Sequence, residues 1–501
     1  MTHKRAFFDG TILITKRIKN MQVLTTHLPG DTFTPVGIYL RLRDIFPHAL
    51  LLECTDYSSR ENAFSYITVK PFAGIKATKD TFSKIPINGP QSKVNLESPM
   101  LLPGLVDGFL DELKQTGIPT NQHMPGIFGY TSYDAINTFD NVNIESPGKS
   151  TDTIPLLKYD LYRIVIAINH FNSTITITEL IPENEESMTQ ELISILANRN
   201  NTFFPFRNTG EERVMTSDED FKEQVKQGIS FCQRGDVFQI VLSRKYEQDF
   251  TGDEFNVYRA LRSINPSPYL FYFDFLDFKL FGSSPEVQLS VGDGKAMINP
   301  IAGTVVRTGD AAADTRLIAE LLDNPKENSE HAMLVDLARN DLSRHARNVK
   351  VNNFREVHTY SHVIHLVSTV QGELEKKGSL YRLFADTFPA GTLSGAPKHR
   401  AIQLIDQTEG KARGFYGGAI GFMGFGDSLN HAIMIRSFMS KSGTLYYQGG
   451  AGVVIHSTPQ GELNEVDGKI SALRKAITQA AKIPSSRKDL NPQLLNLVNN
   501  A

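Results

Sequence analysis

The chain has 501 residues, of which 40% are hydrophobic and 21% charged, and this composition excludes a disordered or fibrous protein. A formal net charge of −3 without any basic cluster argues against a nucleic-acid partner. Cys54 and Cys232 lie far apart, so neither a disulfide framework nor a cysteine-based zinc site is indicated.

The amino-terminal residues lack both an unbroken apolar segment and a small-residue cleavage site. No apolar run elsewhere reaches membrane-spanning length. We therefore expect a cytoplasmic protein that has no membrane partner.

In the first half of the chain, residues 42–55, 159–169 and 173–180 are short β-like runs separated by turn-rich segments. This half is predicted to be mostly β with scattered helices. Acidic residues before an apolar periodic stretch predict a helix within 183–200. Residues 203–213 are interpreted as a linker.

The second half begins with an amphipathic pattern over residues 217–235, which predicts a helix ending at a glycine. A strand is expected to follow over 236–250. Further strands and helices are predicted as follows: strands at 269–282 and 432–440, and helices at 400–407 and from near Leu463. Strands mixed with helices without regular β-α-β alternation predict the α+β class.

Two acidic pairs with equal spacing are the most informative motif, Glu327 with Glu330 and Glu462 with Glu465. Residues three apart share one face of a helix, so each pair can direct two carboxylates to one point. Two such helices facing each other would need a hard divalent cation between them, and Mg²⁺ fits oxygen ligands. The alternative for each pair alone is a solvated charged face.

Four glycine-rich stretches in the second half would let a ligand approach backbone N–H groups closely, although each one alone could mark a turn. A phosphate-binding loop is absent, because Ala396 and Pro397 stand where that motif needs glycine before Lys398. The segment around His358, His362 and His365 is rich in β-branched residues and is predicted to be one strand. His358 and His362 would then share one face and His365 the other, which disfavours a three-histidine zinc site.

A series of blocks in unbroken order resembles the chorismate-utilising enzymes, and within them the anthranilate synthase component I group. The blocks lie within residues 217–480 and include GDVFQIVLSR, NPSPYLFYF, GSSPE, PIAGT, HLVSTVQGEL, GTLSGAPK, YGGAIG, MIRS and GGAGVV. The resemblance implies a large two-sheet antiparallel β sandwich with flanking helices and a site in a cleft. It also divides the chain into a region with a tryptophan-binding segment at 1–205, a chorismate-binding catalytic core at 217–480 and a peripheral tail at 481–501.

This resemblance implies roles for particular residues. Glu327, Glu330, Glu462 and Glu465 would bind Mg²⁺, which in turn binds the ring carboxylate of chorismate. Glu286 in GSSPE resembles the acid that protonates the departing hydroxyl, and His365 the histidine of the later pyruvate elimination. The remaining substrate contacts implied by the blocks are Ala302, Thr304, Thr392, Tyr416, Arg436, Gly450, Gly452 and Lys469. Lys469 could equally pair with the neighbouring glutamates.

Two positions discriminate among the activities of the family. Related isochorismate and salicylate synthases carry a lysine, the base for a water nucleophile, where this chain has Gln239. An amide cannot act as that base, so ammonia is favoured over water. Aminodeoxychorismate synthases usually carry a lysine in the PIAGT block, where this chain has Ala302. The anthranilate route is therefore the best match.

The family also often carries a tryptophan feedback site. By resemblance its residues here are Glu53, Cys54, Asn265, Pro268 and Tyr269, although Cys54 replaces the usual serine with a weaker hydrogen-bonding group. Neither cysteine lies in a recognisable glutaminase motif, so a separate glutamine amidotransferase subunit is expected to deliver ammonia.

Rival functions remain open at this point. The runner-up is another chorismate enzyme, aminodeoxychorismate synthase component I or aminodeoxyisochorismate synthase. A non-catalytic tryptophan-binding regulator is disfavoured because Glu286, His365 and all four glutamates are present. A Mg²⁺-dependent phosphohydrolase is disfavoured by the missing phosphate loop.

Overall fold

The computed structural model describes residues 4–8, 11–18, 21–54, 63–87, 89–140, 142, 144, 154–198, 202–359, 363–375, 379–426 and 428–484. The α-helices are α1 Pro35–Leu42, α2 Leu102–Thr116, α3 Thr189–Ala197, α4 Asp218–Gln233, α5 Phe255–Ile264, α6 Ala311–Asp323, α7 Pro325–Ser343, α8 Leu380–Thr387, α9 Lys398–Glu409 and α10 Pro459–Ala480. Short 3-10 helices are η2 Pro99–Leu101, η3 Tyr133–Thr138 and η4 Gly391–Leu393.

The strands, in chain order, are β1 Lys4–Phe8, β2 Thr11–Ile18, β3 Met21–Pro29, β4 Leu50–Cys54, β5 Phe64–Ala77, β6 Thr81–Ile85, β7 Ser92–Asn95, β8 Ile127–Thr131, β9 Leu157–Asn169, β10 Thr174–Pro182, β11 Phe206–Val214, β12 Gln239–Gly252, β13 Tyr269–Asp274, β14 Lys279–Ser284, β15 Val287–Gly292, β16 Lys295–Ile298, β17 Ile301–Val306, β18 Ala346–Thr359, β19 Val363–Leu374, β20 Gly395–Ala396, β21 Ala419–Met423, β22 Leu429–Ile433, β23 Ser437–Lys441 and β24 Thr444–Val453.

All the strands belong to one continuous antiparallel network that branches at the long pair β5 and β9. One arm runs β5-β4-β13-β14-β23-β24-β12 and ends at β11. The other runs β9-β8-β21-β22-β15-β16-β19, which pairs with β17 and β18. The α+β class is confirmed, but two separate packed sheets are not, because β5 and β9 bond the two arms together.

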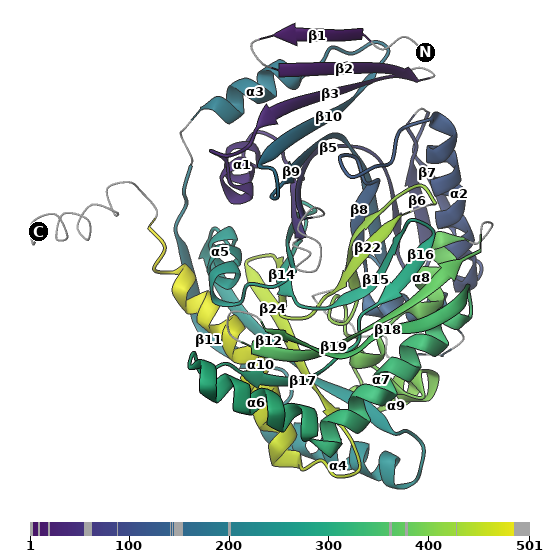
Figure 1. Cartoon of the computed structure of the whole chain (residues 1–501), viewed down its shortest axis with the longest axis vertical. Helices are drawn as coiled ribbons and strands as arrows, with labels where there is room; N and C mark the ends of the chain where they lie inside the picture. The colour runs from purple at the N-terminus through teal and green to yellow at the C-terminus, as the bar shows by residue number, and fades with distance from the viewer. Residues whose placement is uncertain are drawn as a thin grey trace, which may run out of the picture.

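The arms have buried side chains on both faces, as period-two alternation shows. On β4, Leu50 and Leu52 join a cluster that also contains side chains of the second arm, α2 and α8, whereas Leu51 joins a cluster beneath α4, α5 and α10. Both clusters contain residues from the two halves of the chain. Burial of one such leucine contributes roughly 2 kcal/mol. Figure 1 shows β1, β2, β3 and β10 at one end and α4, α6, α7 and α10 around the other.

The helix ends follow from local chemistry. Ser217 caps α4 by accepting from the Asp220 N–H, and Gly235 beyond its end has φ +79°, a conformation that glycine adopts without strain. At α10, Thr458 is the N-cap and Pro459 occupies the first turn. The two helices predicted from 217 and from near Leu463 are therefore confirmed, the second with an earlier start.

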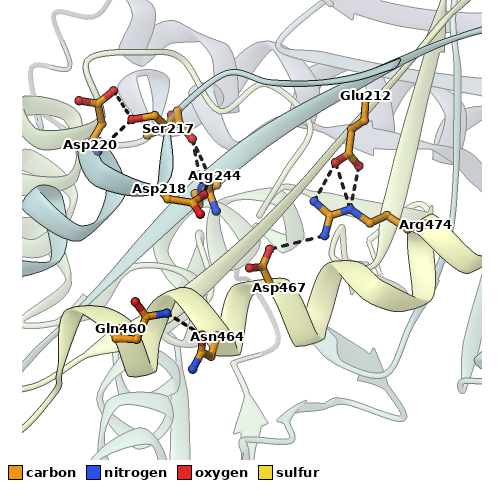
Figure 2. Close-up of polar contacts among 10 residues, drawn as sticks. Glu212, Ser217, Asp218, Asp220, Arg244, Gln460, Asn464, Asp467 and Arg474 are labelled. Atoms are coloured by element: carbon orange, nitrogen blue, oxygen red, sulfur yellow. Dashed lines mark hydrogen bonds and ion pairs between the residues drawn. The ribbon is translucent and has the colours of Figure 1, made fainter. Parts of the chain in front are cut away.

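The predicted linker at 203–213 is wrong, because β11 occupies most of it. This strand pairs with β12, and most of its residues are exposed to solvent. Its sequence therefore lacks the alternation of apolar and polar residues by which strands are predicted. It also contacts α10, where Arg474 Nη2 donates a 2.7 Å hydrogen bond to Glu212 (Figure 2). Within α10, Asp467 lies 3.5 Å from Arg474 Nη1 and helps to position that guanidinium (Figure 2). Arg244 of β12 likewise donates to Asp218 Oδ1 over 2.6 Å at the start of α4 (Figure 2).

Two other predicted strands are interrupted. Residues 269–282 form the hairpin of β13 and β14, which turns at Leu276 with φ +71°. Residues 432–440 break between β22 and β23, where Arg436 has φ +49°. A left-handed backbone at a non-glycine residue ends a strand without leaving a glycine or proline signal. In the predicted tail, residues 485–501 lie outside the described residues.

In the described part of the chain, no helix is long and apolar enough to cross a membrane.

Candidate active site

Two glycines of β24 open a space beside β12. Gly450 lies opposite Ser243, and Gly452 lies opposite Val241. A Cβ atom at Gly452 would be 2.5 Å from Gln239 Nε2, and one at Gly450 would be 3.0 Å from Tyr416 Oη. Any larger residue would therefore displace the side chains that gather over this strand.

Glu286 follows β14 and is buried, with 8% of its surface exposed. Thr392 Oγ1 donates a 2.9 Å hydrogen bond to Glu286 Oε1. Burial raises the pKa of Glu286 to about 7, against the opposing effects of Thr392, Lys469 and Arg436. A carboxyl group with a pKa near neutrality is suited to donate a proton.

Arg436 lies between β22 and β23 and interacts electrostatically with Glu286. Its Nη1 donates to Asn265 Oδ1 over 3.3 Å, and its backbone oxygen accepts from the Ser283 N–H over 3.1 Å. Burial lowers the pKa of Arg436, but the guanidinium stays charged. A planar cation at this place can bind a carboxylate through two parallel hydrogen bonds.

His365 lies on β19 opposite Thr304 of β17 and opposite His358 of β18. The single strand predicted for the three histidines is therefore wrong: β18 and β19 are two strands that pair antiparallel, and directly opposed residues point to the same face. His362 lies outside the described residues. Burial and, next, the charge of Arg436 lower the pKa of His365 to about 4, so its imidazole is neutral at pH 7.

The two glutamate pairs lie on α7 and α10. Glu330 Oε1 accepts a 2.8 Å hydrogen bond from Gln239 Nε2. Glu465 Oε1 accepts from Lys469 Nζ, also over 2.8 Å, and Lys469 in addition donates to the Gly450 oxygen over 2.9 Å. Glu462 is buried, with 5% exposed. Lys469 thus pairs with a neighbouring glutamate, which was one of the two partners expected for it, and it also contacts β24.

The four glutamates were expected to bind Mg²⁺ together. Carboxylate oxygens are the donors that Mg²⁺ prefers. Yet among the described residues no three His, Cys, Asp or Glu side chains are grouped closely enough to hold a metal ion. No three of Glu327, Glu330, Glu462 and Glu465 are therefore grouped at one point in this structure, in which Glu330 and Glu465 each accept a hydrogen bond from a neighbour.

Comparison with known proteins identifies the fold. Residues 53–475 match the family model described as chorismate binding enzyme. The chain belongs to the chorismate-binding enzyme family.

Its similarity to individual members spans nearly the whole chain. It is 34% identical to anthranilate synthase component 1 of Aquifex aeolicus over 91% of this chain and 95% of that protein. With the Bacillus subtilis protein of the same name the identity is 35%, over 92% of each chain. The crystal structure of anthranilate synthase component I from Streptococcus pneumoniae superposes with a TM-score of 0.69 at 30% identity, covering 89% of this chain and 99% of that one.

The remaining substrate residues expected from the chorismate-binding family are placed near these groups. Thr392 touches Glu286, and Tyr416 is close enough to Glu286 and Glu465 that their charges raise its pKa, after the larger effect of burial. Tyr416 is therefore a neutral hydroxyl. Ala302 is buried on β17, the strand that also carries Thr304.

A buried pair that the sequence did not reveal supports this part of the chorismate-binding fold. Arg413 donates to both carboxylate oxygens of Glu409, over 2.9 and 2.6 Å, and to the backbone oxygens of Leu393 and Val241 over 2.7 Å each. Glu409 in turn accepts 2.8 Å hydrogen bonds from the Ser243 N–H and hydroxyl. The pair joins β12 to the segment that carries Thr392. An i,i+4 Glu–Arg spacing at a helix end looks like an ordinary surface pair, so no sequence signal marks it.

The predicted tryptophan residues are brought together in part. Cys54 at the end of β4 lies directly opposite Tyr269 of β13. Glu53 is buried and binds Tyr258 over 2.6 Å and Arg262 over 2.8 Å, which makes it a structural anchor between β4 and α5. Asn265 contacts Arg436 of the active site. Pro268 directly precedes Tyr269.

Proposed function

We propose that this chain is the ammonia-using component of an anthranilate synthase, which converts chorismate and ammonia to anthranilate, pyruvate and water. The proposal rests on relatives of that name that match most of both chains, and on Gln239 and Ala302 where water-using and aminodeoxychorismate-forming enzymes carry lysines. The single observation that carries it is that the buried acid Glu286 and the buried His365 both interact with the cation Arg436.

The chemistry follows from these groups. Chorismate carries a ring carboxylate, an enolpyruvyl carboxylate and an allylic hydroxyl, which leaves poorly as hydroxide. Glu286 gives its proton to that hydroxyl, which departs as water while ammonia adds to the ring. Arg436 and Tyr416 bind the enolpyruvyl carboxylate. Neutral His365 then accepts the proton of the aminated ring carbon as the bond from the ring to the enolpyruvyl oxygen breaks. The ring becomes aromatic, and the enolpyruvate that leaves takes up one proton to become pyruvate.

The donor types of Glu327, Glu330, Glu462 and Glu465 suit Mg²⁺, and when bound the ion would polarise the ring carboxylate. Among the described residues no three of these side chains are grouped closely enough to hold the ion, and the roles of Glu286, Arg436, Tyr416 and His365 do not depend on it. The relatives are named component 1, which implies a second component. Burial raises the pKa values of Cys54 and Cys232, so neither thiol is suited to act as the nucleophile of a glutaminase. A separate glutamine amidotransferase subunit that supplies ammonia fits both observations. Tryptophan as a feedback inhibitor is part of the same proposal, as is a cytoplasmic location.

Product analysis tests the function. The purified chain is incubated with chorismate, Mg²⁺ and either ammonium chloride at pH 8.5 or glutamine, and products are separated by chromatography. Anthranilate and pyruvate in equal amounts are expected with ammonium and none with glutamine. An unaromatised amino product would favour the aminodeoxychorismate or aminodeoxyisochorismate alternative. Tryptophan binding without turnover would favour a non-catalytic regulator.

A further inference from the structure

A second pocket, of about 360 Å³, lies in the amino-terminal part of the sheet. Its walls come from residues 71–78 at the end of β5, from β6 and β7 and from the start of β9. It shares no residue with the active site. It is also distinct from the proposed tryptophan segment. His48, which lines the pocket, precedes the first residue of β4, Leu50, whereas Cys54 is the last residue of that strand, about 13 Å from Leu50.

The floor of the pocket, which we define as His48, Lys158 and Asp160, contains a carboxylate oxygen without a hydrogen-bond donor. Asp160 is 5% exposed, and its Oδ2 accepts no hydrogen bond in the structure. Lys158 Nζ forms an ion pair with that oxygen at 3.8 Å, beyond hydrogen-bond distance. His48 Nε2 lies 3.4 Å from the same oxygen and 3.3 Å from Lys158 Nζ, which has only donors. In the tautomer in which His48 Nε2 accepts from Lys158, it has no proton to give Asp160. Buried carboxylate oxygens are normally satisfied, so this one is open to a donor from a ligand.

Backbone features preserve this arrangement. A Cβ atom at Gly74 would lie 2.2 Å from Asp160 Oδ1, so only glycine leaves room for the carboxylate. His48 has φ +67°, a conformation that costs free energy in a non-glycine residue. Its ring is held edge-on to Tyr162 and Phe275, at centroid distances of 6.1 and 5.9 Å. The strained backbone at His48 thus places the imidazole ring at the floor of the pocket.

The rest of the pocket is cationic and apolar. Lys76 and Lys93 lie at its rim, and Lys158 is half-buried inside. Burial lowers the pKa of Lys158, and Lys76 adds to that effect while Asp160, Asp277 and Asp274 oppose it. Phe72, Ile75 and the 49% exposed Ile85 supply an apolar wall. Lys158 is paired with Asp160, so Lys76 and Lys93 give the lining a net positive charge that attracts an anion.

We propose that this pocket binds a small organic acid that combines a carboxylate, an apolar ring or chain, and one hydroxyl or ammonium donor. The ligand carboxylate is held by the lysines, its donor satisfies Asp160 Oδ2, and its apolar body packs on Phe72, Ile75 and Ile85. The pocket volume is in the range typical for small-molecule sites.

Calorimetric titration of the full chain tests this with a matched set of probes. The probe 3-hydroxybenzoate has all three features, benzoate lacks the donor, and 3-hydroxybenzyl alcohol lacks the anion. We expect 3-hydroxybenzoate to bind at least tenfold more tightly than either partner, since a hydrogen bond to a charged group is lost in each comparison. L-phenylalanine against 3-phenylpropanoate makes the same comparison for an ammonium donor.

Variants locate the binding. Lys158→Met should weaken 3-hydroxybenzoate binding at least tenfold, and Asp160→Asn should abolish the preference over benzoate. Lys226→Met, on the exposed face of α4, is the matched control and should change nothing. If the buried variants fail to fold, Ile85→Glu places a negative charge at the half-exposed mouth and should weaken binding similarly. Absence of binding by every probe at 10 mM, about the weakest affinity such a site would show, or binding unaffected by Lys158→Met and Ile85→Glu, overturns the proposal.

Discussion

Burial raises the pKa of Glu286 to about 7, and this shift connects catalysis with stability. The proton that we propose Glu286 donates is held at neutral pH because the side chain is withdrawn from water, which makes its charged form costly in free energy. Functional sites commonly keep such a cost because the reaction needs the perturbed group.

Replacement of Glu286 by Gln should lower kcat about 10²- to 10⁴-fold, because the general acid is lost. In the wild-type chain, kcat/KM should fall as the pH rises above about 7, where Glu286 loses its proton. Initial rates of anthranilate formation with ammonia, corrected for the fraction present as NH3, measure both effects. If kcat/KM of the Glu286→Gln variant fell above about pH 7 in the same way as that of the wild-type chain, the assignment of Glu286 as the general acid would be contradicted.

The same variant should be more stable than the wild type at alkaline pH. Folded Glu286 keeps its proton to about pH 7, whereas the unfolded carboxyl loses it near 4.5, so the wild-type free energy of unfolding falls across that window and is level above it. The advantage of Gln should therefore grow between pH 4.5 and 7, to roughly 1–3 kcal/mol. Urea unfolding at pH 5 and pH 8 measures it, and an equal difference at both values would refute the shift.

At the scale of elements, the site depends on how segments are fastened together. The Arg413–Glu409 pair joins β12 to the loop of Thr392, and the contact of Asn265 with Arg436 joins the proposed tryptophan segment to the active site. These links involve residues far apart in sequence, and each connects a secondary structure element to a functional side chain.

Replacement of Arg413 by Met should lower the free energy of unfolding by about 3–5 kcal/mol, because Glu409 would be left buried without its charge partner. The urea midpoint measures this loss. Arg347→Met is the control, since Arg347 is 78% exposed in its pair with Glu375 and should change stability by less than about 0.5 kcal/mol. Adding Glu409→Gln to the Arg413 variant should restore part of the loss; no restoration would show that the pair does not act through its charges.

Replacement of Asn265 by Ala should raise KM for chorismate about fivefold, because Arg436 loses a hydrogen-bonding partner worth about 1 kcal/mol. The concentration of tryptophan for half-inhibition should rise in the same variant. Exposed Asn352→Ala serves as the control. An altered tryptophan response with an unchanged KM would separate the two sites and remove the proposed coupling.

For the whole molecule, the antiparallel network places α7 and α10 beside the glycine-bearing strand β24, although the two helices lie more than a hundred residues apart. Glu330 and Glu465 accept hydrogen bonds there from Gln239 and Lys469, and among the described residues no three carboxylates are grouped closely enough to hold a metal ion. Metal binding therefore has to be tested on the complete chain.

Removal of divalent ions with EDTA should lower ammonia-dependent turnover at least tenfold, and Mg²⁺ should restore it. Glu330→Gln should need a higher Mg²⁺ concentration for half-maximal rate, because one carboxylate ligand becomes a neutral amide. The control Glu219→Gln changes an exposed glutamate of α4. Full activity in EDTA would contradict the glutamate metal site.

The sequence by itself determined the family, the α+β class and the helices α4 and α10, and it is the source of the proposal that Glu286, His365 and Arg436 are site residues, because these inferences depend on local periodicity and on motifs that lie within one segment. Only the tertiary structure decided that β11 is an edge strand, that His358 faces His365, and that Arg413 fastens the site, because each depends on a partner far away in the chain. It also decided that no three of the four glutamates with equal spacing are grouped closely enough to hold a metal ion in this structure. Spacing along a helix sets the face on which a carboxylate lies, whereas the packing of strands and the nearest hydrogen-bond donor determine where its oxygens point.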